Sequence, residues 1–177
     1  METREKIINS EDIFDGKVIK VKKYTVELPD GSISFREEVL HGGGAGAIVY
    51  DNGYIYLVSQ FRLAANAELW EIPAGKLEKG EDAESTIKRE LVEEIGVKAN
   101  ALKKIAAVYP SPGYTSEVLH VYYCDDFEKV PQKLDKGEFL NVKKVAVKEA
   151  FDMLDSGEIK DGKTVIALLY LKNILNL

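Results

Sequence analysis

Residues 75–97 read GKLEKGEDAESTIKRELVEEIGV and predict an amphipathic helix from Asp82 to Ile95. Apolar residues recur at every fourth position of this segment: Ala83, Ile87, Leu91 and Ile95. This is the period of a helix that buries one face. Asp82 is a suitable N-cap and Gly96 is a suitable residue to end the helix.

Three carboxylates lie close together on the same predicted helix. Glu90, Glu93 and Glu94 fall within about one third of a turn, beside the apolar stripe. Like charges at this spacing destabilise a helix by about 0.2–0.5 kcal/mol per pair, so the sequence predicts a cation among them. Hard oxygen ligands suit Mg²⁺ or Mn²⁺, and Arg89 is placed to orient one carboxylate.

The segment resembles the Nudix box, G-x5-E-x7-R-E-U-x-E-E-x-G-U with U aliphatic, at every fixed position. The matching residues are Gly75, Glu81, Arg89, Glu90, Leu91, Glu93, Glu94, Gly96 and Val97. The resemblance implies a hydrolase that cleaves a nucleoside diphosphate linked to another moiety. It also implies a mixed sheet inside an α/β/α sandwich.

The resemblance assigns roles within and beside the box. Glu90, Glu94 and the carbonyl of Ala74 would hold Mg²⁺ or Mn²⁺, about two or three ions per site. Arg89 would orient Glu93 or Glu90, and Glu93 is one candidate for the general base.

Two stretches ahead of the box are similar to those of ADP-ribose pyrophosphatases. They are Gln60-Phe61-Arg62 and Leu69-Trp70-Glu71-Ile72-Pro73-Ala74-Gly75. Arg62 is predicted to bind a diphosphate oxygen, and Glu71 is grouped with it as a substrate-binding residue. Trp70 either stacks on adenine or fills the core, and the sequence leaves both interpretations open.

Ser111-Pro112-Gly113 follows the box in the same subgroup register, because Pro112 lies sixteen residues after Gly96. This resemblance makes Pro112 and Gly113 candidate substrate-binding residues. Glu117 is a candidate for binding a ribose hydroxyl or a metal-bound water.

The second candidate for the general base is Glu138, which immediately precedes a predicted strand. In the subgroup that this chain resembles, a glutamate at this position acts from a mobile loop, so that substrate binding gates the chemistry. The residues after it in this chain, Leu140-Asn141, are less acidic than the usual pattern. The choice between Glu138 and Glu93 therefore stays open.

The remaining pattern predicts a mixed α/β fold. Alternating segments around Pro29-Asp30-Gly31 and around Asp51-Asn52-Gly53 predict two β-hairpins. Further strand patterns cover residues 101–109, 117–124 and 139–147, and helices are predicted near residues 148–157 and 163–175. No doubly wound parallel sheet is expected.

Gly42-Gly43-Gly44 marks a predicted boundary between an N-terminal β-hairpin domain, residues 1–43, and a Nudix catalytic domain, residues 44–177. A small sheet cannot bury both faces alone. This shortfall fits the ADP-ribose-cleaving proteins that the chain resembles, in which the N-terminal sheet packs against, or swaps with, the partner subunit. The resemblance therefore implies a homodimer.

Composition limits the partners of the chain. A net charge of −6 argues against a nucleic-acid-binding surface. The small nucleoside diphosphate substrate that the resemblance implies would then need metals and a few placed arginines. No apolar run approaches a membrane span, and a lone cysteine, Cys124, permits no internal disulfide. The N-terminal METREKIINS lacks an apolar signal-peptide core, so a cytoplasmic protein is expected.

Two other functions remain open. A different nucleotide sugar or a dinucleotide is an alternative substrate, because the base-contacting residues cannot be located from the sequence. A non-catalytic sensor that binds ADP-ribose-like ligands is another alternative, although such a module has no need of the intact carboxylates.

Overall fold

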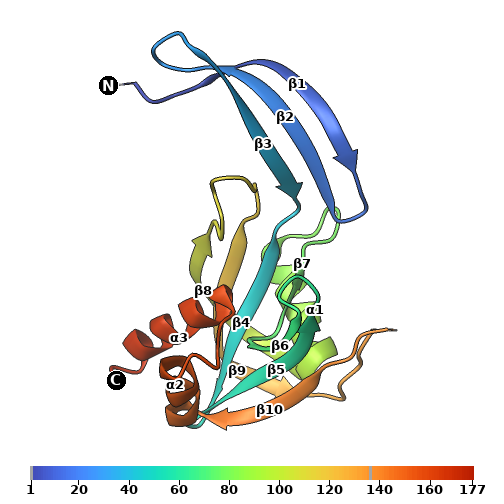
Figure 1. Cartoon of the computed structure of the whole chain (residues 1–177). Coiled ribbons are helices and arrows are strands. Elements are labelled where there is room, and N and C mark those ends of the chain that lie inside the picture. Colours follow the sequence, from blue (N-terminus) through green and yellow to red (C-terminus); the bar gives the residue numbers. More distant parts are fainter. Residues whose placement is uncertain (1, 136) are drawn as a thin grey trace. The chain divides into compact units, whose positions relative to one another are not determined.

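The computed structural model describes residues 2–135 and 137–177 (Figure 1). Its internal contacts divide the chain into two compact units. The first contains residues 2–43 and 109–118, and the second contains residues 44–108 and 119–177. Each unit is described separately.

A mixed sheet forms the centre of the second unit. Its strands are β4 (Gly44–Asp51), β5 (Tyr54–Arg62), β6 (Ala67–Glu71), β7 (Ala74–Lys76), β8 (Val97–Val108), β9 (Leu119–Lys129) and β10 (Asn141–Ala146). The order is β10-β5-β4-β9-β8, with β6 beside β5 and β7 beside β4. Only the β4–β9 pair is parallel among the described ladders of this sheet.

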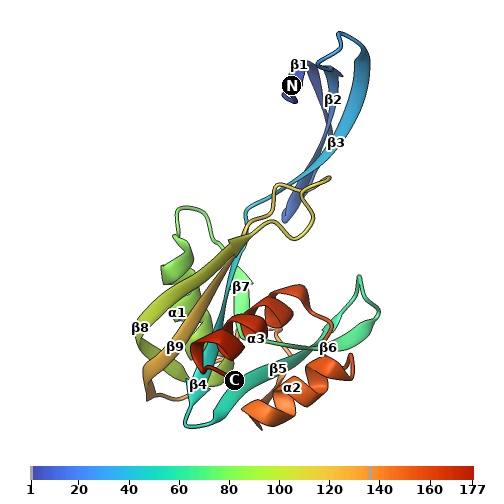
Figure 2. The same ribbon diagram turned by 90° about the vertical axis from the view of Figure 1, so that its left-hand side faces the viewer.

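Helices cover both faces of this sheet. Helix α1 (Ala83–Ile95) lies on one face, whereas α2 (Val147–Asp155) and α3 (Gly162–Ile174) lie on the other (Figure 2). The expected α/β/α sandwich is therefore confirmed. All three helices lie within two residues of their predicted ends.

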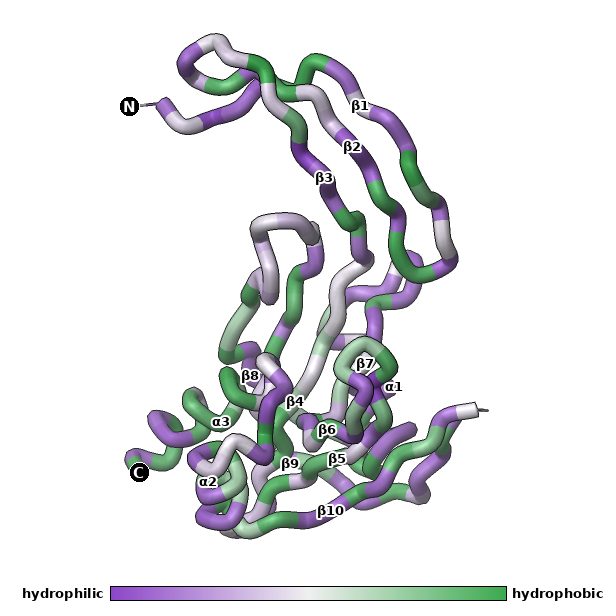
Figure 3. Tube along the Cα trace, viewed as in Figure 1, coloured by the Kyte–Doolittle hydropathy of each residue, from purple (hydrophilic) through white to green (hydrophobic). Residues whose placement is uncertain are grey.

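Strand alternation builds a separate core on each face. Along β4, Ala47 and Val49 pack with Leu91 of α1, whereas Ile48 between them packs with Leu168 of α3. Successive side chains of a strand point to opposite faces, so a strand covered on both sides must be apolar throughout. In Figure 3, β4 passes from white at its glycine-containing start to green along its apolar part.

The turn between β4 and β5 has the backbone geometry that its sequence predicts. Asn52 and Gly53 have φ angles of 49° and 89°. Two consecutive positive φ angles are required by the type I′ hairpin turn, for which Asn-Gly is the favoured pair. The second predicted hairpin is therefore confirmed.

The first unit contains a three-stranded antiparallel sheet, ordered β1-β2-β3. Its strands are β1 (Lys6–Asp15), β2 (Ile19–Glu27) and β3 (Ile33–His41). The predicted β2–β3 hairpin is confirmed, whereas β1 was not predicted. Every residue of β1 is exposed, including Ile7, Ile13 and Phe14.

No helix in residues 2–135 and 137–177 is both long enough and apolar enough to cross a membrane.

Candidate active site

Helix α1 carries the box carboxylates and is capped at both ends by its own sequence. Asp82 Oδ1 accepts hydrogen bonds from the backbone N–H groups of Glu84 and Ser85, each over 2.9 Å. At the other end Gly96 adopts a φ of 61°, and its N–H bonds back to the last turn. The caps fix where the helix starts and stops, and hence the rotation of its acidic side chains.

Two of the box carboxylates, Glu90 and Glu94, are buried. Their exposed fractions are 8% and 6%. Burial, reinforced by the charges of Glu90 and Glu138, raises the pKa of Glu94 to about 8. Burial also raises the pKa of Glu90, although Arg89 opposes this effect. Both side chains would thus be stabilised as anions by an additional positive charge.

Strand β7 lies directly against these carboxylates. The N–H of Ala74 donates to Glu94 Oε2 over 2.9 Å. A Cβ added at Gly75 would stand 1.7 Å from Glu90 Oε1, well inside any permitted contact. The fixed glycine of the box is therefore required so that the backbone can approach Glu90.

Arg89 joins the remaining carboxylates into a network. Its Nη1 donates to Glu90 Oε1 over 2.8 Å and to Glu93 Oε2 over 2.9 Å. Its Nε and Nη2 donate to the two oxygens of Glu81, which also accepts from Thr86 Oγ1 over 2.7 Å. These bonds lower the pKa of Glu81. Arg89 thus contacts both Glu90 and Glu93, whereas its role in orienting one of them stays a prediction.

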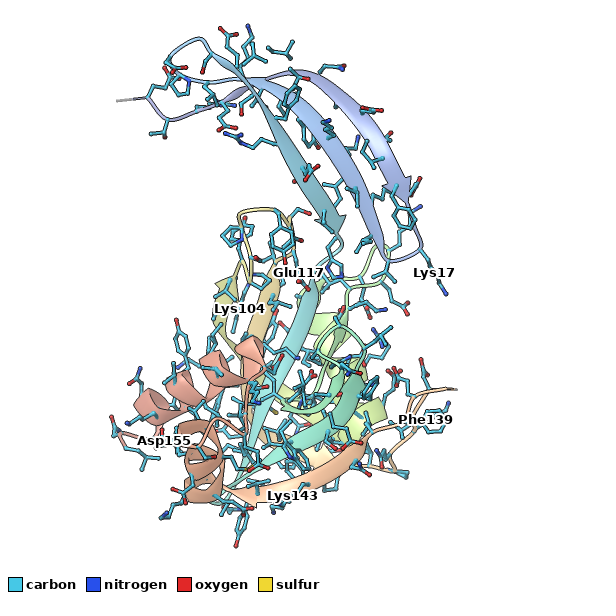
Figure 4. The ribbon with its side chains drawn as sticks, viewed as in Figure 1. Lys17, Lys104, Glu117, Phe139, Lys143 and Asp155 are labelled. Atoms are coloured by element: carbon cyan, nitrogen blue, oxygen red, sulfur yellow. The ribbon has the colours of Figure 1, made fainter. Side chains whose placement is uncertain are left out.

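The two candidate bases differ in their surroundings. Glu93 is half-buried and bonded to Arg89, whereas Glu138 is exposed on the loop between β9 and β10. The charge of Glu138 contributes to raising the pKa of both Glu90 and Glu94, so its carboxylate interacts electrostatically with the two buried carboxylates. Its neighbour Phe139, labelled in Figure 4, is 84% exposed.

The chemistry of these groups fits a divalent cation shared with substrate. Within residues 2–135 and 137–177, no three His, Cys, Asp or Glu side chains converge as a ready-made metal cage. The predicted metal ligands are Glu90, Glu94 and the Ala74 carbonyl. Such a small set of protein ligands is typical of Mg²⁺, whose remaining ligands are water and phosphate oxygens. The burial of two neighbouring carboxylates is the observation that fits such an ion.

A second ionic cluster surrounds Arg62, at the end of β5. Arg62 Nε donates to Glu71 Oε1 over 2.6 Å, and its Nη2 donates to Glu71 Oε2 over 2.7 Å. Glu71 is only 2% exposed, and burial alone would raise its pKa. The bonds from Arg62 and the charge of Lys163 outweigh burial and lower that pKa. Glu71 thus holds Arg62 in place with both of its oxygens.

Lys163 and Thr164, at the start of α3, belong to this cluster and were not predicted. Lys163 Nζ contacts Glu71 and also donates to Asp161 Oδ1 over 3.0 Å. Thr164 Oγ1 accepts from the N–H of Ile72 over 2.8 Å. The available signal was Lys163, a charged residue at the start of an apolar helix. Its partner Glu71 lies 92 residues away in sequence, so the contact could not be predicted locally.

Trp70 is partly buried and packs against the core cluster that α2 and α3 share with the sheet. Lys143 Nζ lies 5.8 Å from the centre of its indole ring. Packing against this core is the second of the two roles considered for Trp70.

Pro112, Gly113 and Glu117 lie in the first unit, in the segment that accompanies its sheet. Pro112 and Gly113 line a cavity of about 330 Å³, together with residues of β2 and β3 that include Tyr24 and Arg36. Glu117, labelled in Figure 4, has Oε1 3.4 Å from His41 Nδ1. Their predicted contact with substrate stays a prediction.

Comparison with known proteins agrees with this geometry. The family model described as NUDIX domain matches residues 40–168. An "ADP-ribose pyrophosphatase" of Bacillus subtilis is 44% identical over 95% of this chain and 92% of its own length. The "Methanol dehydrogenase activator" of Bacillus methanolicus is 39% identical, with the same two coverages.

A more distant relative has a different name. A "GDP-mannose pyrophosphatase" of Yersinia enterocolitica is 33% identical over 85% of this chain and 86% of its own length. Among solved structures, one titled "Crystal structure of ADP compounds hydrolase" has a TM-score of 0.85 at 19% identity, covering 98% of this chain and 95% of that one. This likeness shows the fold. With the family model and these relatives, it establishes that the chain is a hydrolase of the Nudix family.

Proposed function

We propose that this protein hydrolyses the diphosphate linkage of ADP-ribose to AMP and ribose 5-phosphate. The observation that carries the proposal is the pair of buried carboxylates, Glu90 and Glu94, against the glycine-containing strand β7. The relative from Bacillus subtilis supports the choice of ADP-ribose, because its similarity extends over 95% of this chain and beyond the box.

Glu90, Glu94 and the carbonyl of Ala74 would hold Mg²⁺ or Mn²⁺, about two or three ions per site. When bound, these ions neutralise the diphosphate oxygens and polarise phosphorus for attack. Arg89 keeps Glu90 and Glu93 at fixed positions through its two short hydrogen bonds. This preorganisation avoids a cost of ordering the acidic side chains when substrate arrives.

The substrate is oriented by Arg62, which donates to a diphosphate oxygen while Glu71 fixes its guanidinium. Trp70, Glu71, Pro112, Gly113 and Glu117 complete the proposed substrate-binding set. Direct stacking of Trp70 on adenine and direct contact of Glu71 with substrate are the parts of this set that the packing supports least.

Glu138 is the proposed general base, with Glu93 as the alternative. Water attacks phosphorus in line, its oxygen forms the new P–O bond, and the bridging P–O bond to the leaving phosphate breaks. The base accepts the proton of the water. An exposed loop carboxylate suits this task, because it can approach the water when the substrate is bound.

We also propose that the protein is a cytoplasmic homodimer that acts on a small molecule, without nucleic acid or membrane as partners. The support for dimerisation is the first unit itself. Large apolar side chains are exposed on β1 and β3: Ile7, Ile8, Ile13, Phe14, Ile33 and Phe35, with Val18 in the β1–β2 turn. A three-stranded sheet with this much exposed apolar surface gains stability by packing against a second copy.

Another nucleotide sugar remains the second candidate substrate, because the similarity to the GDP-mannose pyrophosphatase extends over 86% of the length of that relative. The deciding experiment incubates the purified protein with Mg²⁺ and, in parallel, ADP-ribose, other ADP-sugars, dinucleotides and GDP-mannose. AMP and ribose 5-phosphate from ADP-ribose at the highest kcat/KM are expected. A higher kcat/KM for GDP-mannose would overturn the choice of substrate. Binding of ADP-ribose without hydrolysis would favour the sensor.

A further inference from the structure

Lys163 has an unusual position for a lysine. Its side chain is 11% exposed, and its Nζ contacts the buried carboxylate of Glu71 as well as Asp161. A long cationic side chain is rarely buried unless its charge is paired. The partner it shares, Glu71, is the residue that also binds Arg62.

The charges of this cluster are unevenly distributed. Glu71 is a single anion held between two cations, Arg62 and Lys163. Asp161 also accepts hydrogen bonds from the N–H and hydroxyl of Thr164 at the start of α3, where a negative charge is favourable. Arg62, Glu71 and Lys163 together carry one net positive charge, which Asp161 balances at the start of α3. Without Lys163, the cluster would carry one net negative charge, which disfavours an anionic ligand beside Arg62.

Arg62 leaves one edge of its guanidinium outside these ion pairs. Nε and Nη2 of Arg62 are both bonded to Glu71. Among the hydrogen bonds of the described residues, Nη1 donates none, and the side chain is 42% exposed. A guanidinium clamped along one edge presents its other edge in a fixed direction, which suits an anionic oxygen.

The start of α3 is also tied to the backbone that leads to the box. Thr164 bonds the N–H of Ile72, and two residues later Ala74 bonds Glu94. Lys163 contacts Glu71 and Thr164 contacts Ile72, so the start of α3 holds the segment between Arg62 and the buried carboxylates at two adjacent residues. Lys172 on the same helix is exposed, and its side chain makes no such contacts with the described residues.

We propose that Lys163 is a positioning residue, which acts through Glu71 to keep the Arg62 guanidinium oriented toward the diphosphate of the substrate and to keep the surrounding cluster free of net negative charge. This inference rests on the proposed diphosphate hydrolysis. It assigns to α3 a part in substrate binding that lies outside the Nudix box.

Steady-state kinetics of Lys163→Met with ADP-ribose and Mg²⁺ tests the proposal. KM is expected to rise by about 10-fold, the scale of a lost hydrogen bond to a charged group, with a smaller change in kcat. Lys163→Arg should restore most of the affinity. Lys172→Met on the same helix is the matched control and should behave as the wild type.

A double-mutant cycle separates positioning from a general loss of structure. If Lys163 acts through Glu71, Glu71→Gln removes the charge that Lys163 balances, and Lys163→Met should then raise KM much less than it does in the wild type. Thermal unfolding of each variant shows the folded fraction. Equal KM values for the wild type and Lys163→Met, or additive effects in the cycle, would overturn the inference.

Binding of inorganic diphosphate, measured by calorimetry, tests the role of Lys163 independently of ADP-ribose hydrolysis. Weaker binding by Lys163→Met than by the wild type supports the inference, even if ADP-ribose is not hydrolysed. Absence of hydrolysis with this difference preserved would count against the proposed activity alone. Equal diphosphate binding by the two proteins would count against the role of Lys163.

Discussion

The N–H of Ala74 donates a hydrogen bond to Glu94 Oε2 over 2.9 Å, so the loop before the box and the box helix meet at one carboxylate. Glu94 is thereby fixed at the edge of β7 while it stays 6% exposed. A carboxyl group held in this way, beside the buried Glu90, is positioned for a cation before any ligand arrives, and cation binding favours loss of its proton.

Gly75→Ala tests the close approach of β7 to Glu90. The new Cβ would overlap Glu90 Oε1, so the carboxylate must move. A displacement near 1 Å in a catalytic group lowers kcat by about 100-fold, and a loss of this size in magnesium-dependent kcat is expected. Gly162→Ala is the matched control, because nothing lies within 4 Å of its added Cβ, and it should keep the wild-type kcat.

Glu138→Gln tests the proposed base. An amide cannot accept the proton of water, so kcat should fall by about 100-fold or more, while the Kd for ADP-ribose changes little. Single-turnover kinetics and equilibrium binding measure the two quantities separately. A defect confined to binding would assign Glu138 to the substrate, and an unchanged kcat would transfer the role to Glu93.

The pH dependence of stability reports on Glu94 in the metal-free protein. Its pKa rises from 4.5 to about 8 on folding, mainly through burial. Because the folded state binds this proton more tightly, the group stabilises the fold below about pH 4.5, and that contribution is lost as pH rises toward 8. Urea unfolding in the presence of a chelator should show this fall.

Glu94→Gln removes the titrating group, so its free energy of unfolding should vary less with pH between about 5 and 8 than that of the wild type. Glu84→Gln, an exposed change in the first turn of α1, is the control and should keep the wild-type slope. Equal slopes for Glu94→Gln and the wild type would contradict the raised pKa.

Dimerisation through the first unit predicts a clear effect of charge on its exposed apolar surface. Phe35 is 60% exposed on β3, and Phe35→Asp should shift the protein toward monomer in light scattering coupled to gel filtration. Leu177→Asp changes a residue that is 64% exposed in the second unit and should leave the mass unaltered. A wild type that is monomeric at all concentrations would refute the proposed dimer.

Local sequence signals predicted α1 and its caps, and also the turn at Asn52-Gly53. Each depends on residues close together in the chain, so periodicity and turn chemistry suffice. Strand β1 was missed for a physical reason. Its register with β2 shifts between Ile7 and Asn9 and again between Asp12 and Phe14, so its side chains do not alternate regularly.

In the site, too, contacts between residues close in sequence were predicted, whereas contacts between distant residues were not. Arg89 was expected to orient Glu93 or Glu90, and it contacts both, because all three lie within about one helical turn. The contact of Lys163 with Glu71 joins residues 92 positions apart, and no local pattern specifies it. The role of Glu71 in holding Arg62 likewise depends on the pairing of β5 with β6.

The most direct test of the proposed activity is the magnesium-dependent hydrolysis of ADP-ribose by Glu94→Gln. The change replaces a buried carboxylate by an amide of nearly the same shape, which removes the anionic ligand while leaving the acceptor for the Ala74 N–H. We expect kcat/KM to fall by orders of magnitude while circular dichroism shows an intact fold. Hydrolysis at the wild-type rate would contradict the assignment of Glu94 as a metal ligand, and with it the proposed catalytic centre.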